Sequence, residues 1–174
     1  MIKELTDNER EILEYFAKRP EDIHIRGLSE ELEMPYPSVR KALKDLEEKG
    51  FVESDKKSKM TFYSHSGEKF RKAKKLINLE QIKESGLVEL IEKELRPEAV
   101  VLFGSYLEGR DKKNSDIDIA VIGGRGKNLD LSGFEQDLNR EVQITEVENL
   151  KEESAEFRNT LANGLVLQGY LEVV

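Results

Sequence analysis

The sequence predicts an α+β fold with two domains, one of helices and a short hairpin and one of a small mixed sheet with helices. Apolar residues recur at helical spacing through the start of the chain, and two β-like runs follow within residues 51–63. Two apolar, strand-like runs then lie close together within residues 99–122. A chain of 174 residues has room for two small cores. We expect a first domain over 1–66, a connecting helix over 67–78 and a second domain over 79–174.

Two helices are expected at the start of the chain. Thr6 and Glu9 have the three-residue spacing of a capping box, and the apolar residues after them keep a helical interval until Pro20 ends the pattern. A shorter helix is expected over residues 25–32, and Pro35 stops it. This order predicts two helices joined by a short connection.

A third helix is expected over residues 36–49, and a hairpin follows it. A proline lies in its first turn, and Gly50 suits its C-terminal end. Val39, Leu43 and Leu46 recur at helical spacing and are expected to pack inward. The two β-like runs that follow are separated by a lysine-bearing turn, which predicts a hairpin.

Three helices followed by a hairpin resemble a winged helix-turn-helix, and the stretch LSEELEMPYPSVRKALKDLEEKGFV carries the resemblance within residues 5–65. The resemblance implies that the third helix enters the major groove of duplex DNA with its N-terminal residues at base edges. A module that mediates protein contacts is the alternative. The expected DNA contacts on the helix and the hairpin turn are Tyr36, Ser38, Arg40, Lys41, Lys44, Lys56, Lys57 and Lys59.

Positive charge is concentrated in one part of the chain. The whole chain carries 28 basic and 36 acidic residues, and this net charge of −8 argues against a general nucleic-acid binder. Residues 36–75 nevertheless carry 12 basic and 6 acidic side chains. This segment holds the third helix, the hairpin and the helix after it, where a DNA-binding domain needs to neutralise phosphates. We therefore expect duplex DNA to bind through residues 36–75.

A strand, a tight turn and a pair of carboxylates follow one another in the second domain. The apolar run 99–103 predicts a buried strand, and Gly104-Ser105 after it allows a tight turn that offers N–H groups and a hydroxyl to a phosphate. Asp116 and Asp118 open the next apolar strand, where a period of two places both carboxylates on one face. Two like charges this close repel unless a cation lies between them, so the pattern indicates a Mg²⁺ site for phosphoryl chemistry.

Gly104-Ser105, the ten-residue gap and Asp116-Ile117-Asp118 resemble the signature of the minimal nucleotidyltransferases of the DNA polymerase beta superfamily, over residues 76–174. The resemblance implies that Mg²⁺ or Mn²⁺ and ATP or another nucleoside triphosphate are used to transfer a nucleoside monophosphate. Acceptors in the family include proteins, small molecules and nucleic acids, and some members adenylylate a HEPN-type partner protein. The implied catalytic and metal-binding residues are Asp116 and Asp118, with Gly104, Ser105, Lys112 and Lys113 at the nucleotide.

Two positions depart from the family pattern. The family has a third acidic residue on a following strand, and the matching position in the expected strand 141–147 is Gln143. Glu141 lies on the same face two residues earlier and is the alternative third metal ligand, whereas Glu146 faces the other way. The family also carries Arg where this chain has Glu108. Both changes predict weakened catalysis.

The rest of the second domain is expected to complete a mixed sheet with helices on one face. Residues 150–161 predict a helix, Asn163-Gly164 ends it, and an apolar run follows at 165–171. The expected architecture of the whole chain is a winged helix-turn-helix followed by a small nucleotidyltransferase-type mixed sheet.

Several classes of protein are excluded by what the chain lacks. It has no cysteine, which excludes a disulfide framework and a cysteine-based zinc site. Its two histidines, His24 and His65, lie outside the second domain, which argues against a histidine-dependent triad there. It has no apolar run of membrane-spanning length and no signal-peptide core, so we expect a cytoplasmic protein without a membrane partner.

Three functions follow from these observations. The first is a Mg²⁺-dependent nucleotidyltransferase with a DNA-binding module, transferring AMP to an unspecified acceptor. The second is a DNA-binding transcriptional regulator whose transferase domain is weak or inactive and senses nucleotide or holds a partner. The third, a purely structural protein, is disfavoured by the Asp-x-Asp motif. The oligomeric state is open, with a homodimer as one alternative.

Overall fold

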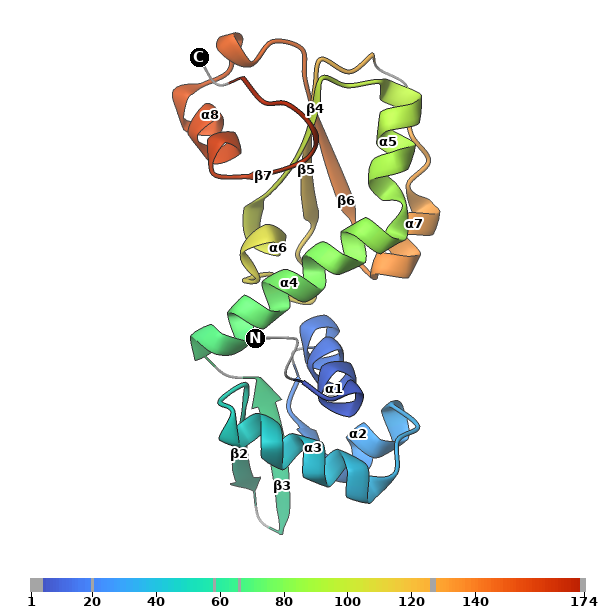
Figure 1. The fold of residues 1–174 in the computed structure, drawn as a ribbon, viewed down its shortest axis with the longest axis vertical. Helices are drawn as coiled ribbons and strands as arrows, with labels where there is room; N and C mark the ends of the chain where they lie inside the picture. The colour runs from blue at the N-terminus through green and yellow to red at the C-terminus, as the bar shows by residue number, and fades with distance from the viewer. Residues whose placement is uncertain (1–4, 20, 58, 66, 126–127, 173–174) are drawn as a thin grey trace. The chain divides into compact units, whose positions relative to one another are not determined.

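The computed structural model describes residues 5–19, 21–57, 59–65, 67–125 and 128–172 (Figure 1). The chain forms two compact units, residues 1–77 and 78–174. Both helices and strands contribute, as the predicted α+β class requires. Within the described residues, no helix combines the length and the apolar character needed to cross a membrane.

The N-terminal unit contains the helices and the hairpin that the sequence predicted. Its sheet has the order β1-β3-β2 with antiparallel pairing, and β2 and β3 form the hairpin. Three helices precede this hairpin, which gives the winged helix-turn-helix arrangement. The elements are α1 (Asp7–Lys18), β1 (Ile23–His24), α2 (Ile25–Glu31), α3 (Tyr36–Glu48), β2 (Val52–Lys57) and β3 (Met60–His65).

The predicted capping box starts α1. The Thr6 hydroxyl accepts a hydrogen bond from the Glu9 N–H, and the Glu9 carboxylate accepts one from the Thr6 N–H at 2.7 Å. The other Glu9 carboxylate oxygen lies 2.5 Å from Lys49 Nζ, directly after α3. Burial raises the pKa of Glu9, but the hydrogen bonds from Lys49 and Thr6 outweigh burial and hold this pKa below its ordinary value. Glu9 therefore both caps α1 and ties it to the end of α3.

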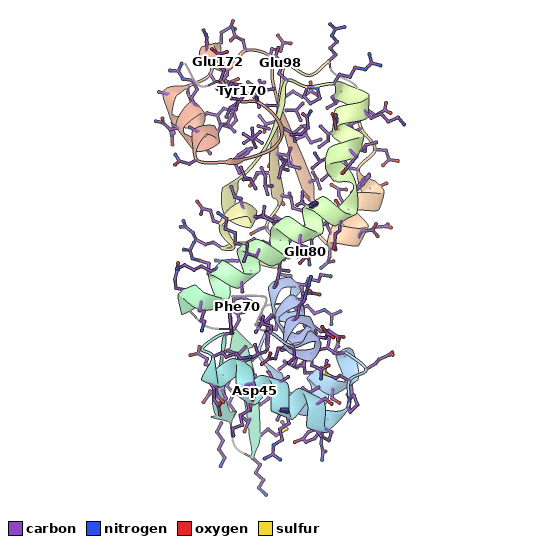
Figure 2. All side chains as sticks on the ribbon, in the orientation of Figure 1. Asp45, Phe70, Glu80, Glu98, Tyr170 and Glu172 are labelled. Atoms are coloured by element: carbon purple, nitrogen blue, oxygen red, sulfur yellow. The ribbon has the colours of Figure 1, made fainter. Side chains whose placement is uncertain are left out.

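One apolar core holds the N-terminal unit together. Val39, Leu43 and Leu46 of α3 are fully buried, as their spacing predicted. The same core includes Phe70 (labelled in Figure 2) and Ile77 of the next helix, α4 (Gly67–Ser85). This helix continues past residue 78, where the connecting helix was expected to end.

The C-terminal unit is a four-stranded mixed sheet. The strand order is β6-β5-β4-β7, with β5 and β6 parallel and the other pairs antiparallel. The elements after α4 are α5 (Leu87–Leu95), β4 (Ala99–Phe103), α6 (Gly104–Glu108), β5 (Ile117–Ile122), α7 (Ser132–Leu138), β6 (Val142–Val147), the 3₁₀ helix η2 (Leu150–Glu152), α8 (Ala155–Ala162) and β7 (Leu165–Gly169).

Helices cover both faces of this sheet, so the prediction of helices on one face was wrong. Figure 1 shows α5 and α8 on opposite sides of the strands. Ile119 of β5 packs in a core with α5 and α7, whereas Ala120 packs in a second core with Leu161 of α8. The cause is visible in the sequence of β5, Ile-Asp-Ile-Ala-Val-Ile, because the strand is apolar on both faces after Asp118.

The helix predicted over residues 150–161 is interrupted. Its first part is η2, and α8 begins only at Ala155. The Ser154 hydroxyl accepts a hydrogen bond from the Phe157 N–H at 3.1 Å and so caps a new helix. A capping serine inside an apolar helical pattern therefore marks the break that the pattern alone did not predict.

Candidate nucleotide and metal site

The tight turn after β4 lies against the carboxylate of Asp118. Gly104 adopts a positive φ of +76°, which side chains other than glycine rarely tolerate. A Cβ atom at this residue would lie 2.2 Å from Asp118 Oδ2. Glycine is thus required for both the backbone turn and the close approach. The two motifs that the sequence separates by ten residues meet here.

Asp118 lies in the middle of a row of three side chains on one face of the sheet. It is paired with Phe103 in β4 and with Gln143 in β6. Asp116 directly precedes β5. Burial raises the pKa of the Asp118 carboxyl, and the negative charge of Asp116 raises it further. The predicted carboxylate pair is therefore close enough for the two charges to interact.

The side chain that pairs with Asp118 on the neighbouring strand is a neutral amide. The parallel register places Gln143 beside Asp118, and the Ile117 N–H donates to the Glu141 carbonyl oxygen at 2.8 Å where the two strands begin. No cluster of three or more His, Cys, Asp or Glu side chains able to hold a metal occurs within the described residues. Asp118 therefore has the neutral amide of Gln143, and no carboxylate, at its register position on β6.

A cavity of about 580 Å³, lined by polar and charged residues, borders Asp116. This volume lies in the range of small-molecule sites. Glu141 and Lys113, both predicted site residues, also line the cavity, whereas Lys112 and Gly104 do not. Helix α7 supplies residues that the sequence did not single out, because no motif links them to the carboxylate pair. The complete lining is Lys113, Asn114, Ser115, Asp116, Ser132, Glu135, Gln136, Asn139, Arg140 and Glu141.

Glu108, at the position where the family is expected to carry Arg, forms an ion pair. Arg110 Nη2 lies 2.7 Å from the carboxylate of Glu108. Both side chains are exposed enough to move. While this pair forms, however, the positive charge of Arg110 is neutralised rather than directed at a phosphate.

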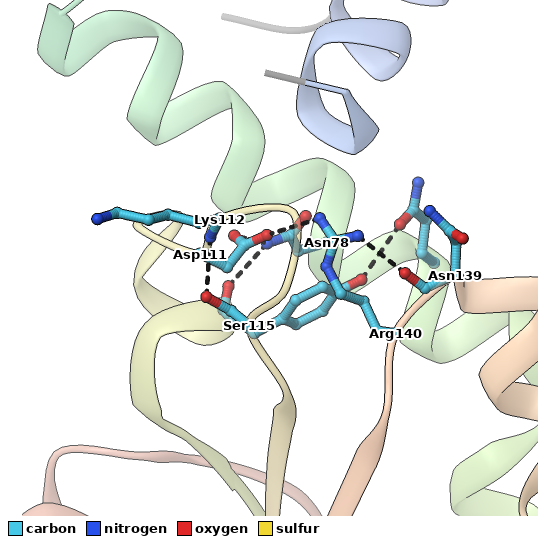
Figure 3. Close-up of polar contacts among 8 residues, drawn as sticks. Asn78, Asp111, Lys112, Ser115, Asn139 and Arg140 are labelled. Atoms are coloured by element: carbon cyan, nitrogen blue, oxygen red, sulfur yellow. Dashed lines mark hydrogen bonds and ion pairs between the residues drawn. The ribbon is translucent and has the colours of Figure 1, made fainter. Parts of the chain in front are cut away.

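A buried polar network holds the loop between α6 and Asp116 (Figure 3). Asn78 Nδ2 donates to Asp111 Oδ1 at 2.9 Å and to the Tyr106 carbonyl oxygen at 2.8 Å. Arg140 Nη2 donates to Asp111 Oδ2 at 3.3 Å, and the exposed fractions of these two side chains are 3% and 0%. The network joins α4, the loop after α6 and the residue preceding Glu141.

The same network buries the side chain of Tyr106. Its hydroxyl donates to Gln81 Oε1 at 3.1 Å, and burial raises the pKa of this hydroxyl far above its ordinary value. Tyr106 is therefore neutral at every physiological pH. The network could not be found from the sequence, because Asp111 pairs with residues 29 and 33 positions away and no local spacing marks such partners.

The predicted DNA-contacting residues lie on α3 and the β2–β3 hairpin. Tyr36 and the cationic side chains are exposed, whereas Ser38 is half-buried. Lys57 lies 2.7 Å from Asp22, and this hydrogen bond raises the pKa of Lys57. Tyr36 and Lys59 line a common cavity of about 520 Å³, so the start of α3 and the tip of the hairpin are neighbours. The exposed cationic residues are Arg40, Lys41, Lys44, Lys56, Lys57 and Lys59.

Family models match both units. The polymerase beta nucleotidyltransferase model matches residues 85–168. The IclR helix-turn-helix model matches residues 10–56. The chain therefore contains a nucleotidyltransferase domain of the polymerase beta type after an N-terminal helix-turn-helix domain. Among curated proteins, no match was found.

Three similar solved structures each match about half of this chain. A ZitR mutant from Lactococcus lactis is 22% identical with a TM-score of 0.43, over 52% of this chain and 62% of that one. AdcR, the adhesin competence repressor of Streptococcus pyogenes, is 15% identical with a TM-score of 0.43, over 52% and 68%. FabT of Streptococcus pneumoniae, solved in complex with DNA, is 20% identical with a TM-score of 0.43, over 52% and 62%. This chain thus spans less than two thirds of the ZitR and FabT chains.

Proposed function

We propose that the C-terminal domain binds a nucleoside triphosphate, with ATP as the first candidate, together with one divalent cation. The observation that supports the proposal is the contact between the Gly104 turn and Asp118, because a tight glycine turn that could hold phosphate lies directly against one of the two predicted carboxylates. The turn and the Ser105 hydroxyl would hold the phosphates, with Lys112 and Lys113 adding positive charge. Mg²⁺ or Mn²⁺ suits two carboxylates with phosphate oxygens and water.

The reaction proposed for this site is nucleotidyl transfer. The bound cation would neutralise charge on the triphosphate. An acceptor hydroxyl attacks the α-phosphorus and loses its proton, the bond from this phosphorus to the bridging oxygen breaks, and pyrophosphate leaves. The acceptor would approach Asp116 through the cavity that this residue lines. A side chain of a HEPN-type partner protein is the first candidate for the acceptor, on the resemblance to the family.

We expect this transfer to be slow. Two-metal sites use a third carboxylate to bind the cation nearest the attacking hydroxyl, and Gln143 offers a neutral amide at the matching register position. Glu141 is the alternative third ligand, since it borders the same cavity as Asp116. Nucleotide binding would then persist where catalysis is weak.

A second candidate function is transcriptional regulation. The neutral Gln143 and the pairing of Arg110 with Glu108 both lower the catalytic potential of the C-terminal domain. The N-terminal domain meanwhile presents exposed cationic side chains along residues 36–75, which we propose as the contact with duplex DNA. In this function the C-terminal domain senses nucleotide or holds a partner.

The test is incubation with ATP labelled at the α-phosphate, Mg²⁺ or Mn²⁺, and either the protein alone or the protein with the product of the neighbouring gene. Transfer of label to protein or to a small molecule supports the enzyme, and the Asp116→Asn variant serves as the inactive control. Binding of labelled ATP without transfer supports the regulator. The absence of both binding and transfer would contradict the proposed nucleotide site.

A further inference from the structure

A cationic cavity lies wholly within the N-terminal unit. Its volume is about 520 Å³, which is in the range of ligand sites. Arg26 and Lys59 supply two positive charges, and no acidic residue lines the cavity within the part of the chain that the structure describes. The whole chain carries a net charge of −8, so a cavity bordered by cations alone is an exception on its surface. Its charge suits an anion.

Both cations are available to a ligand. Arg26 and Lys59 are exposed, and neither forms an ion pair with any residue that the structure describes. Lys57, the neighbouring lysine of the hairpin, instead lies 2.7 Å from Asp22. The charge of Lys57 is therefore partly neutralised within the protein, whereas the charges of Arg26 and Lys59 are not.

The rest of the cavity lining combines a donor with exposed apolar surface. His24 Nδ1 accepts a hydrogen bond from the Gly27 N–H at 2.7 Å, so the donor nitrogen of this ring is Nε2. Tyr36 is 44% exposed and Met60 is 51% exposed. A ligand that presents both an anionic group and an apolar surface matches this lining. The sugar-phosphate backbone of a nucleic acid has both.

We propose that this cavity binds backbone phosphates of one strand of duplex DNA, with Arg26 and Lys59 as the phosphate contacts. The proposal rests on the DNA binding proposed above. The cavity lies between the start of α3 and the tip of the hairpin, which supply Tyr36 and Lys59. When a recognition helix lies in the major groove, a backbone strand runs beside it, and the cavity receives that strand. Arg26 lies in α2, outside the basic segment 36–75, so the interface extends to α2.

Contacts to phosphates position a protein on DNA without reading the sequence. Arg26→Ala should therefore weaken binding to every duplex by the same factor. It should also flatten the salt dependence by a slope of about 0.9, the value for one phosphate that is no longer neutralised. Arg26→Ala/Lys59→Ala should flatten this slope by about 1.8.

Fluorescence anisotropy of the full chain tests this with two labelled duplexes of different sequence, each at several salt concentrations. Arg26→Lys keeps the charge and should keep the slope of the wild type. Lys18→Ala is the matched control, since it removes one exposed cation of the same unit from a cavity that Glu11, Glu14 and Glu31 border. This variant should leave the slope unchanged. Circular dichroism checks that each variant is folded, and Arg26→Gln replaces Arg26→Ala if that variant is not.

The outcomes separate this cavity from DNA binding in general. A wild type that binds duplex with the same salt slope as Arg26→Ala would overturn the phosphate contact while leaving DNA binding in place. A shift in preference between the two duplexes would show that Arg26 reads bases, and an equal loss in Lys18→Ala would show a general effect of charge. Either result would overturn the proposal. A wild type that binds no duplex would contradict both this proposal and the DNA binding on which it rests.

Discussion

At the scale of single residues, we propose that the neutral amide of Gln143, beside Asp118 on the next strand, limits how many cations the candidate site can hold. We expect Gln143→Asp to add the third carboxylate beside Asp118 and to raise the rate of nucleotidyl transfer by at least about tenfold, which corresponds to about 1.4 kcal/mol. The measurement is the transfer of label from ATP, wild type against variant at equal Mg²⁺ concentration. Gln143→Asn, which keeps the position neutral, is the matched control.

The Glu141→Gln variant distinguishes a site in which Glu141 is the third metal ligand from one in which Gln143 occupies that position. If wild-type transfer is fast and Glu141→Gln abolishes it, Glu141 is the third ligand and Gln143 is not at the metal. If Gln143→Asp leaves the protein inactive, the paired Arg110 and Glu108 become the better explanation for the absence of catalysis, and the regulator is favoured.

Asp118 is expected to lower the stability of the protein in the absence of a cation. Burial and the nearby charge of Asp116 raise the pKa of Asp118, so ionising it costs more in the folded than in the unfolded state. Stability therefore falls as the pH rises through the raised pKa, and Asp118→Asn should unfold at a higher temperature than the wild type at pH 7. Thermal unfolding across pH tests this, and the difference should shrink as the pH falls through that pKa. An exposed carboxylate variant, Asp137→Asn, should change the midpoint little at any pH.

Whether a residue near the site could be predicted from the sequence depends on how far away in the chain its partners lie. Gly104, Asp116 and Asp118 could be singled out from the sequence because each motif is local and its spacing sets a side-chain direction, and their role in the site stays a prediction. Asp111 and Arg140 were not found, since their pairing depends on how β6 enters the sheet. A buried carboxylate in a loop carries no local signal until its distant partner is known.

At the scale of elements, α3 and the β2–β3 hairpin are expected to bind duplex DNA in different ways. Replacing Lys56, Lys57 and Lys59 with Ala should weaken binding to all sequences and flatten the salt dependence, by a slope of about 0.9 for each phosphate that is no longer neutralised. Replacing Arg40 with Ala should also change sequence preference, because the start of a recognition helix reaches base edges. Gel shifts at several salt concentrations measure both effects.

The salt slopes show whether the hairpin touches DNA. Equal slopes for the wild type and the triple variant would remove the hairpin from the interface. A protein that binds no duplex at low salt would contradict DNA binding through residues 36–75 and favour the protein-contact alternative. Lys93→Ala, an exposed lysine of α5 in the other unit, is the control for a general loss of positive charge.

The Asp111 network is expected to behave as one unit that holds the loop before Asp116. Asp111→Asn or Arg140→Gln alone leaves a buried charge without its ionic partner, which costs about 3–5 kcal/mol of folding free energy. The double variant should cost less than the sum of the two, which a double-mutant cycle of denaturant unfolding measures. Lys93→Gln breaks an exposed pair and should cost less than about 1 kcal/mol. Additive single effects would show that the two residues act independently.

The elements themselves were predicted with uneven success, for physical reasons. Each helix and strand with a strong apolar period was found, including α3 and β4. The break before α8 was missed because Ser154 acts through one local hydrogen bond rather than through the pattern. The helix at α8 was predicted, but its place on the second face of the sheet was missed, although the apolar residues on both faces of β5 after Asp118 indicate that both faces are covered.

At the scale of the whole molecule, charge separates the roles of the two units. The basic segment 36–75 belongs to the helix-turn-helix unit, and the carboxylate pair belongs to the nucleotidyltransferase unit. DNA binding and nucleotide binding are therefore expected to depend on different residues. The function proposed for the second unit requires that Asp116 and Asp118 together hold a cation with the nucleotide.

Calorimetric titration with Mn²⁺ and ATP tests this requirement most directly. We predict that the wild type binds ATP more tightly with Mn²⁺ than with a chelator present, and that Asp116→Asn/Asp118→Asn loses this gain, by at least about tenfold in affinity. The affinity of the wild type should also fall at acid pH, where protons compete with the cation at Asp118. Asp137→Asn/Glu156→Gln removes the same number of exposed carboxylates elsewhere in the domain and should bind as the wild type does. Equal Mn²⁺-dependent binding by the wild type and by Asp116→Asn/Asp118→Asn would contradict the proposed cation site.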